Sequence, residues 1–155
     1  PITVARPFNN YGPGMKIDDK RLPADFAKQV IEKKDLIILS DGTPTRTFCY
    51  ISDAIAGYLL CLTHEAYDIF NIGMDKPEIN VKHFAEIFKM MGSDIFNYKG
   101  SINFKKSLDI NYMIDNPNRR CPSIDKARKI LGFNPTVDVK AGVERYLRFL
   151  KDNLN

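Results

Sequence analysis

The sequence lacks the glycine-rich turn by which a dinucleotide-binding fold approaches a pyrophosphate. Its nine glycines form neither a G-x-G-x-x-G nor a G-x-x-G-x-x-G pattern. Such a turn lets backbone N–H groups at a helix N-terminus reach the phosphates. A self-contained dinucleotide site is therefore not expected in these 155 residues.

Cysteine and histidine are also scarce. Cys49, Cys61 and Cys121 are widely spaced and include no C-x-x-C pair, so we expect no disulfide framework and favour a reducing, cytoplasmic compartment. His64 and His83 stand far apart, with no carboxylate or cysteine at metal-ligand spacing, so we expect no metal site. No apolar run approaches the length of a membrane span, and no segment is typical of a signal peptide.

Length and composition are ordinary for a globular domain. A chain of this size can bury a real core, and its apolar (44%) and charged (27%) fractions are average values. The net charge of +4 fits anionic small ligands as well as nucleic acid and decides neither. Because the chain starts at Pro1 with a buried-strand type of run, we expect it to be cut from something longer.

Strand patterns alternate with helix patterns, which predicts an α/β fold. β-branched, aromatic and alternating runs predict strands at residues 2–5, 36–39, 45–51, 67–72 and 102–104. Apolar stripes predict helices that begin near Leu22, at Ser52 or Asp53, after Asn80, after Ser123 and at Val139. Gly92 and Gly132 are expected to end two of these helices. The strands are too few for a complete doubly wound sheet.

The stretch from Gly42 to Tyr58 combines a turn, a short strand and a helix start. Asp41-Gly42 with Pro44 marks the turn, and Arg46 follows at the junction. A guanidinium there can form two hydrogen bonds to a phosphate or carboxylate. The alternative is an ordinary exposed arginine in a loop.

Four ordered blocks carry a family resemblance. They are Arg6-Pro-Phe-Asn-Asn-Tyr-Gly-Pro-Gly14, Gly42-Thr-Pro-Thr-Arg-Thr-Phe-Cys-Tyr-Ile-Ser-Asp53, Phe70-Asn-Ile-Gly73, and Arg120-Cys-Pro-Ser-Ile-Asp-Lys-Ala-Arg-Lys-Ile-Leu-Gly132. Together they resemble the C-terminal half of an extended short-chain dehydrogenase/reductase acting on nucleotide sugars. UDP-glucuronate decarboxylases match best, ahead of dTDP-glucose dehydratases and UDP-sugar epimerases.

The resemblance implies a single C-terminal substrate-binding domain over residues 1–155, with a few strands of an incomplete Rossmann-type sheet. The N-terminal NAD-binding domain would be absent. In such enzymes bound NAD oxidises the sugar at C4, the ketone permits decarboxylation, elimination or epimerisation, and the hydride returns. They also use a Tyr-x-x-x-Lys pair, which none of the seven tyrosines here forms. We therefore expect an enzymatic parent, no catalytic residue in this chain and no activity of the chain alone.

The resemblance also implies the residues that bind the diphosphate sugar. Asn9 matches the asparagine that bonds the nucleotide sugar, while Arg46 and Arg120 match two arginines that bind the diphosphate. Arg119 is a further candidate beside Arg120. Two guanidiniums can each give charge-assisted hydrogen bonds to phosphate oxygens. A solvated basic pair is the alternative reading of Arg119 and Arg120.

Four more positions complete the implied site. Backbone groups near Arg21 and Leu22 would line the same pocket, and Pro7 would lie near the nicotinamide. Leu39 stands where the family usually has an aromatic residue that packs on the nucleobase. A leucine lacks the stacking contribution, so the identity of the base is left undecided.

The expected partners are a nucleotide diphosphate sugar, first a UDP-sugar, and the N-terminal half of the same enzyme, with the parent a homodimer. No nucleic acid or membrane partner is expected. A stand-alone, non-catalytic nucleotide-sugar-binding module is the main alternative, although residues 2–5 then need a partner strand. A basic nucleic-acid binder is a third reading, and it predicts binding that weakens steeply with salt.

Overall fold

The computed structural model describes residues 1–105 and 117–153. The strands are β1 (Thr3–Pro7), β2 (Asn10–Tyr11), β3 (Leu36–Ile38), β4 (Thr45–Arg46), β5 (Cys49–Tyr50), β6 (Asp68–Ile72), β7 (Ile79–Asn80), β8 (Ile102–Phe104) and β9 (Arg119–Arg120). The helices are α1 (Leu22–Ile31), α2 (Ile51–Leu62), α3 (Val81–Phe96), α5 (Asp125–Leu131) and α6 (Val139–Asp152). Within the two described ranges, no helix has both the length and the apolar character needed to cross a membrane.

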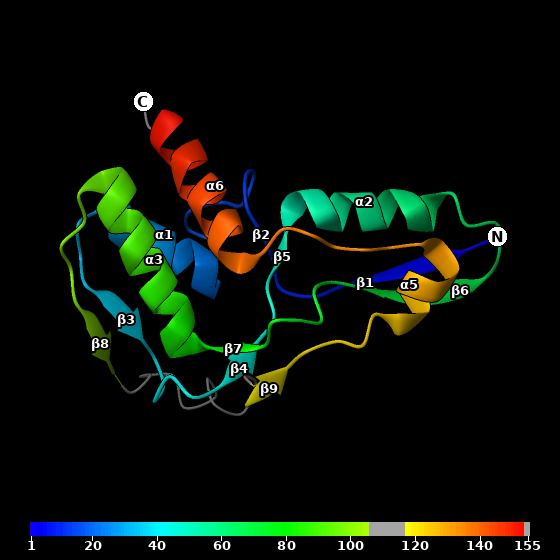
Figure 1. Cartoon of the computed structure of the whole chain (residues 1–155), viewed down its shortest axis with the longest axis horizontal. Helices are drawn as coiled ribbons and strands as arrows, with labels where there is room; N and C mark the ends of the chain where they lie inside the picture. The colour runs from blue at the N-terminus through cyan, green and yellow to red at the C-terminus, as the bar shows by residue number, and fades with distance from the viewer. Residues whose placement is uncertain (106–116, 154–155) are drawn as a thin grey trace.

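The strands form four small sheets, most of them parallel. β1 pairs with β6 in parallel, from Thr3 opposite Asp68 to Pro7 opposite Ile72. Helices α2 and α5 pack on this pair at one end of the molecule (Figure 1). β3 pairs with β8 at the other end, beside α1 and α3. Between the two ends, β4 is the middle strand of a three-stranded sheet in the order β7-β4-β9.

The larger core joins α1, α3 and α6 to the segment around β5, and it is rich in aromatic rings. Phe48 stacks on Phe84 of α3 with ring centroids 3.7 Å apart and planes 7° apart. Tyr11 meets Phe48, Tyr50 and Phe84 edge to face, and its hydroxyl donates to the carbonyl of Val139 at 3.1 Å. Such stacked and edge contacts add to the free energy gained by burying the rings.

Several helix ends agree with the sequence. The Asn80 side chain accepts the His83 N–H at 2.7 Å and caps α3, as expected. Gly132 ends α5 in the left-handed conformation with φ 69°, which glycine adopts without steric cost. Helix α6 begins at Val139, as expected, and continues to Asp152.

Two helix predictions are wrong. α3 does not end at Gly92 but at Phe96, with Asn97 in the left-handed conformation. Gly92 instead serves close packing, because a Cβ there would lie 2.8 Å from Cγ1 of Val30. α2 begins at Ile51, and neither Ser52 nor Asp53 caps it. The Asp53 carboxylate accepts two N–H groups from the loop before α6, those of Thr136 at 2.9 Å and Val137 at 2.8 Å.

Two further details differ from expectation. The segment 45–51 is not one strand, because β4 ends at Arg46 and β5 begins at Cys49. Ser123 lies one position before the N-cap residue of α5, Ile124, although its hydroxyl still accepts the Asp125 N–H at 3.4 Å. The strand predicted at residues 102–104 is present as β8, and residues 106–116 lie outside the described part of the chain.

We expect Gly142→Ala to lower the free energy of unfolding by about 1–3 kcal/mol, because overpacking a filled core forces its side chains to shift. Alanine is otherwise favoured over glycine within a helix by about 1 kcal/mol. A Cβ on Gly142 would overlap the Tyr11 hydroxyl and lie 3.2 Å from Cδ2 of Tyr50. Denaturant unfolding of Gly142→Ala, Tyr11→Phe and the double variant measures the effect. The cost of the alanine should shrink when position 11 lacks the hydroxyl, and an unchanged cost would contradict the crowding.

Candidate functional site

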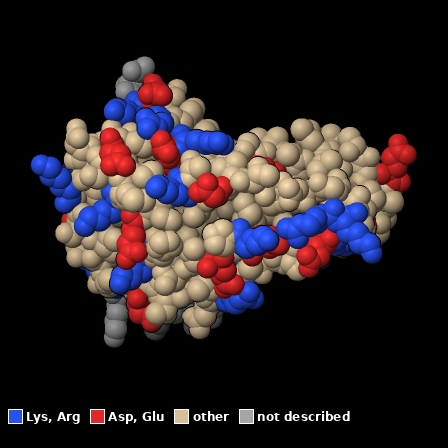
Figure 2. Space-filling view, viewed as in Figure 1, with Lys and Arg blue, Asp and Glu red and all other residues tan. Residues whose placement is uncertain are grey.

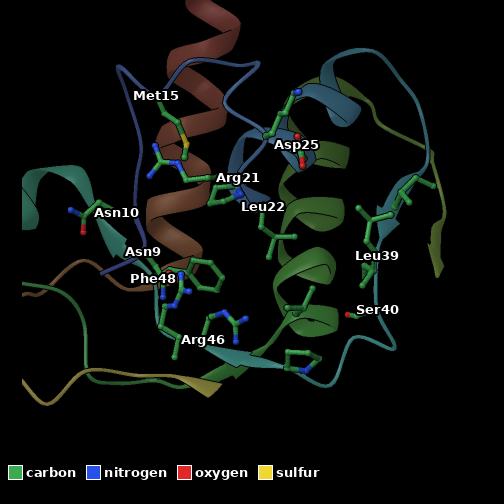
Figure 3. A pocket seen from close by; sticks show the side chains of 17 residues that line it. Asn9, Asn10, Met15, Arg21, Leu22, Asp25, Leu39, Ser40, Arg46 and Phe48 are labelled. Atoms are coloured by element: carbon green, nitrogen blue, oxygen red, sulfur yellow. The ribbon is translucent and has the colours of Figure 1, made fainter. Parts of the chain in front are cut away.

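A pocket of about 650 Å³ opens between the start of α1, the end of β3 and the β4 strand. Figure 3 shows it from close by, with Asn9, Phe48 and Arg46 near one another and Leu39 on another side. Six residues that the sequence nominated for substrate binding line this pocket, namely Asn9, Arg21, Leu22, Leu39, Arg46 and Arg120. The structure thus brings together positions from five separate segments of the chain.

Arg46 and Arg120 form the cationic side of the pocket. They are direct partners across the parallel pair β4–β9, so their side chains leave the sheet on the same face. Arg46 is only 6% exposed, and its Nη1 donates to the carbonyl of Thr45 at 2.7 Å. Arg120 is exposed and lines the pocket rim. One buried and one exposed guanidinium side by side are suited to an anion with two charged groups.

Asn9 holds a conformation that few residues adopt. Its φ is 46°, in the left-handed region, which asparagine enters more readily than other non-glycine residues. The Asn9 Nδ2 donates to the carbonyl of Thr47 at 2.8 Å, and its own carbonyl accepts the Cys49 N–H at 3.2 Å. These bonds fix the loop after β1 against the segment that joins β4 to β5.

The opposite side of the pocket comes from α1 and β3. Arg21 is the N-cap residue of α1, and its guanidinium bonds the Asp19 carboxylate, with Nε 2.9 Å from Oδ1. This guanidinium lowers the pKa of Asp19 below its ordinary value. Leu22 is the first residue of α1, and Leu39 directly follows β3 and is 37% exposed. An exposed leucine here offers an apolar wall without a ring face.

Two nominated residues do not line the pocket. Arg119 makes a bidentate ion pair with Glu78, with Nη2 2.7 Å from Oε2. The alternation of side chains along β9 explains this, because neighbouring residues point to opposite faces of a sheet. Pro7 is the last residue of β1 and lies opposite Ile72. Its expected contact with a nicotinamide stays a prediction.

The structure adds pocket residues that the sequence did not nominate. Phe48 lines the pocket and lies two positions after Arg46, in the connection between β4 and β5. The prediction of one strand over residues 45–51 would have placed both side chains on the same face, which was a usable signal. Asp25 also lines it, and burial raises the pKa of this carboxyl. Lys20 and Val81 come from a turn and a helix start, and no pattern in the sequence connects them to Arg46.

Cationic, amide, carboxylate and apolar side chains line the pocket. Burial raises the pKa of the nearby Cys49 thiol to about 12, so the thiol stays protonated and unreactive at neutral pH. Among residues 1–105 and 117–153, no group of three or more histidine, cysteine or acidic side chains is arranged to hold a metal ion. Cationic, amide and apolar groups around one cavity suit a ligand with an anionic part and an uncharged part.

Comparison with known proteins relates this geometry to a family. Residues 1–73 match the NAD-dependent epimerase/dehydratase family. UDP-glucuronic acid decarboxylase 1 of Arabidopsis thaliana is 29% identical over 153 residues, which cover 99% of this chain and 33% of that protein. UDP-glucuronic acid decarboxylase 3 of the same plant is 34% identical, with 92% of this chain and 39% of that protein covered. The chain spans about a third of the length of these curated relatives.

Solved structures share the fold. UDP-glucuronic acid 4-epimerase from Bacillus cereus, in complex with UDP-glucuronic acid and NAD, matches with a TM-score of 0.79 and 30% identity, over 98% of this chain and 46% of that one. UDP-glucose 4-epimerase from Thermotoga maritima matches with a TM-score of 0.86 and 21% identity, over 99% and 47%, which concerns the fold alone.

The architecture is therefore that of a lobe of an extended short-chain dehydrogenase/reductase, with an α/β fold as the sequence predicted. The match to the NAD-dependent epimerase/dehydratase family lies in residues 1–73, and relatives at about 30% identity align with nearly the whole chain. Both the family resemblance and the fold class inferred from the sequence are confirmed.

We expect Asn9→Ala to lower the free energy of unfolding by about 1–2 kcal/mol, because it removes the bond to Thr47 and strains a left-handed residue. Asn9→Gly loses the same hydrogen bond but accepts the backbone conformation, so its cost should be smaller. Denaturant unfolding of both variants measures the difference. Equal losses would contradict the importance of the backbone conformation at Asn9.

Proposed function

We propose that this chain is the nucleotide-sugar-binding part of an NAD-dependent enzyme that modifies a UDP-sugar by way of a 4-keto intermediate, in the manner of UDP-glucuronate decarboxylases. The observation that carries the proposal is the pairing of Arg46 with Arg120 at the pocket that also contains Asn9. The curated relatives named above support a UDP-glucuronate substrate. On this proposal residues 1–155 act as one substrate-binding domain.

Each part of the ligand has a place in the proposal. The diphosphate lies between the guanidiniums of Arg46 and Arg120, which satisfy it by charge-assisted hydrogen bonds. Asn9 orients the nucleotide sugar, since its loop is fixed beside Arg46 by the bond to Thr47. Leu39 and the backbone near Arg21 and Leu22 cover the nucleobase on the other side of the pocket.

The chain's own residues do not form an NAD site. Its sequence has no glycine-rich pyrophosphate turn, and no Tyr-x-x-x-Lys pair to hold and move a proton. We therefore propose that NAD, which accepts and returns the sugar's hydride when bound, contacts this chain only near Pro7. On this proposal the chain alone is inactive, and it contributes binding and orientation.

A second candidate is a UDP-sugar 4-epimerase. The Bacillus cereus 4-epimerase, 30% identical to this chain, supports it. Both reactions start from the same bound UDP-sugar, so the pocket residues described above have the same roles in either case.

The binding proposal predicts that Arg46→Ala weakens UDP binding by about tenfold or more, as expected for a lost hydrogen bond between charged groups. Arg46→Lys should lose less, because it keeps the charge but not the forked geometry. Arg148→Ala is the matched control, since Arg148 pairs with Glu144 on α6. Calorimetric titration with UDP-glucuronate, UDP, dTDP and UMP measures the affinities. Equal affinities of Arg46→Ala and the unaltered chain would contradict the proposal. The order of the affinities for the four ligands identifies the preferred nucleobase.

The surface near α2 is suited to contact with a further domain rather than with solvent. Ile55, Leu59 and Leu62 lie at helical spacing and are 49%, 57% and 80% exposed. Figure 2 shows the surface over α2 with few charged side chains. Within the described residues, β6 is the only strand that pairs with β1, so the other edge of β1 is open to an additional strand. We propose that the NAD-binding part of the same enzyme covers this edge and this helix face. A stand-alone module would leave both exposed.

If α2 is an interface, Leu59→Glu should change the stability of this chain by no more than about 0.5 kcal/mol, because Leu59 is exposed here. The same substitution should weaken association with a separately produced NAD-binding part, since it places a charge in an apolar contact. Met90→Glu on α3 is the matched control, as Met90 is 42% exposed. Association measured by titration and sedimentation distinguishes the two. Equal binding by both variants would contradict the proposed interface.

A further inference from the structure

One carboxylate connects all three strands of the β7-β4-β9 sheet on the face away from the pocket. Glu78, directly before β7, accepts a hydrogen bond from the hydroxyl of Thr45 on β4. It also accepts from Arg119 on β9, with Nε 2.9 Å from Oε1 and Nη2 2.7 Å from Oε2. Thr45 and Arg119 are cross-strand partners, and so are the next residues, Arg46 and Arg120.

We propose that Glu78 is a positioning residue for the ligand pocket. By tying Arg119 to Thr45 on one face of the sheet, it holds Arg120 beside Arg46 on the other face. The two guanidiniums then meet one ligand at a fixed separation. This inference rests on the proposed function, in which Arg46 and Arg120 bind the diphosphate.

β9 needs such a tie because its backbone attachment is short. The Thr45 N–H donates to the carbonyl of Asn118 at 2.8 Å, and the Thr47 N–H donates to that of Arg120 at 3.3 Å. β9 itself has only two residues, and both are exposed. A bidentate arginine–carboxylate pair adds a directional bond at its first residue.

Glu78 itself lies on a firmly held part of the chain. β7 pairs with β4 in antiparallel orientation, and α3 follows β7 at once. The start of α3 is bonded to the turn before β4, with the Val81 N–H 3.0 Å from the carbonyl of Pro44 and the Lys82 N–H 3.1 Å from that of Gly42. Because Glu78 is itself held in place, its carboxylate can fix the position of β9 relative to β4.

Positioning predicts that removing the Glu78 carboxylate weakens ligand binding, whereas electrostatics alone predicts that it strengthens binding. A negative charge near a diphosphate repels it, so neutralising Glu78 would strengthen binding if charge were all that mattered. Arg119 and Thr45 lower the pKa of Glu78 below its ordinary value, so the group is ionised at neutral pH. A loss of affinity on neutralisation therefore reports positioning.

The test compares Glu78→Gln with Glu86→Gln by calorimetric titration of UDP into the full chain. Glu86 is a matched control, because it is an exposed glutamate paired with His83 on α3. Glu78→Gln should weaken UDP binding by about two- to fivefold, the range expected when a solvent-accessible ion pair is lost. Glu86→Gln should leave the affinity unchanged or slightly raise it. With Arg120→Ala already present, Glu78→Gln should have no further effect on affinity, because the residue it positions is gone.

Amide hydrogen exchange gives a readout that does not need ligand. Glu78→Gln should speed exchange at the Thr45 and Thr47 amides, which bond β9, while Glu86→Gln should not. If UDP binds the unaltered chain and Glu78→Gln binds it equally well or more tightly, the positioning role is overturned while the proposed function stands. Unchanged exchange at both amides also overturns it. If UDP fails to bind the unaltered, folded chain, the proposed function fails and this inference fails with it.

Discussion

The pairing of β4 on both of its edges is the constraint on which the pocket depends. Arg46 lies opposite Ile79 on one side and Arg120 on the other, so backbone hydrogen bonds bring three distant segments to one point. Phe48 follows two positions later and stacks on Phe84 of α3. The cationic side of the pocket is thereby joined to the larger aromatic core, and it cannot shift without disturbing that core.

The two ends of the molecule differ in their surfaces. The pocket lies at the end that contains α1, β3 and β4, where cationic and apolar side chains surround a cavity. The end that contains α2 and β1 instead presents apolar side chains and an open strand edge. In the proposed function, the first end binds the nucleotide and the second attaches the part that carries NAD. This division agrees with a chain that spans about a third of its curated relatives.

The sequence predicted those features that depend on neighbouring residues. The Asn80 cap, the left-handed Gly132 and the apolar stripe of α6 are local, and all are present. The prediction for Gly92 was wrong because its role is to admit Val30 of another helix, which no local pattern shows. The prediction for Asp53 was wrong for the same reason, since its bonds reach a loop more than eighty positions away. The family resemblance nominated six of the residues that line the pocket, and strand alternation explains why Arg120 lines it while Arg119 does not.

The parallel pair β1–β6 also affects how fast this chain can fold. Thr3 pairs with Asp68, so 65 positions separate the partners (68 minus 3). The entropy of closing so long a loop must be overcome before the pairing contributes any stability. During synthesis, β1 leaves the ribosome before β6 and stays without this partner until residue 72 has followed. Contacts of such separation slow folding, and for that interval the unpaired edges of β1 are open to other chains in the cell.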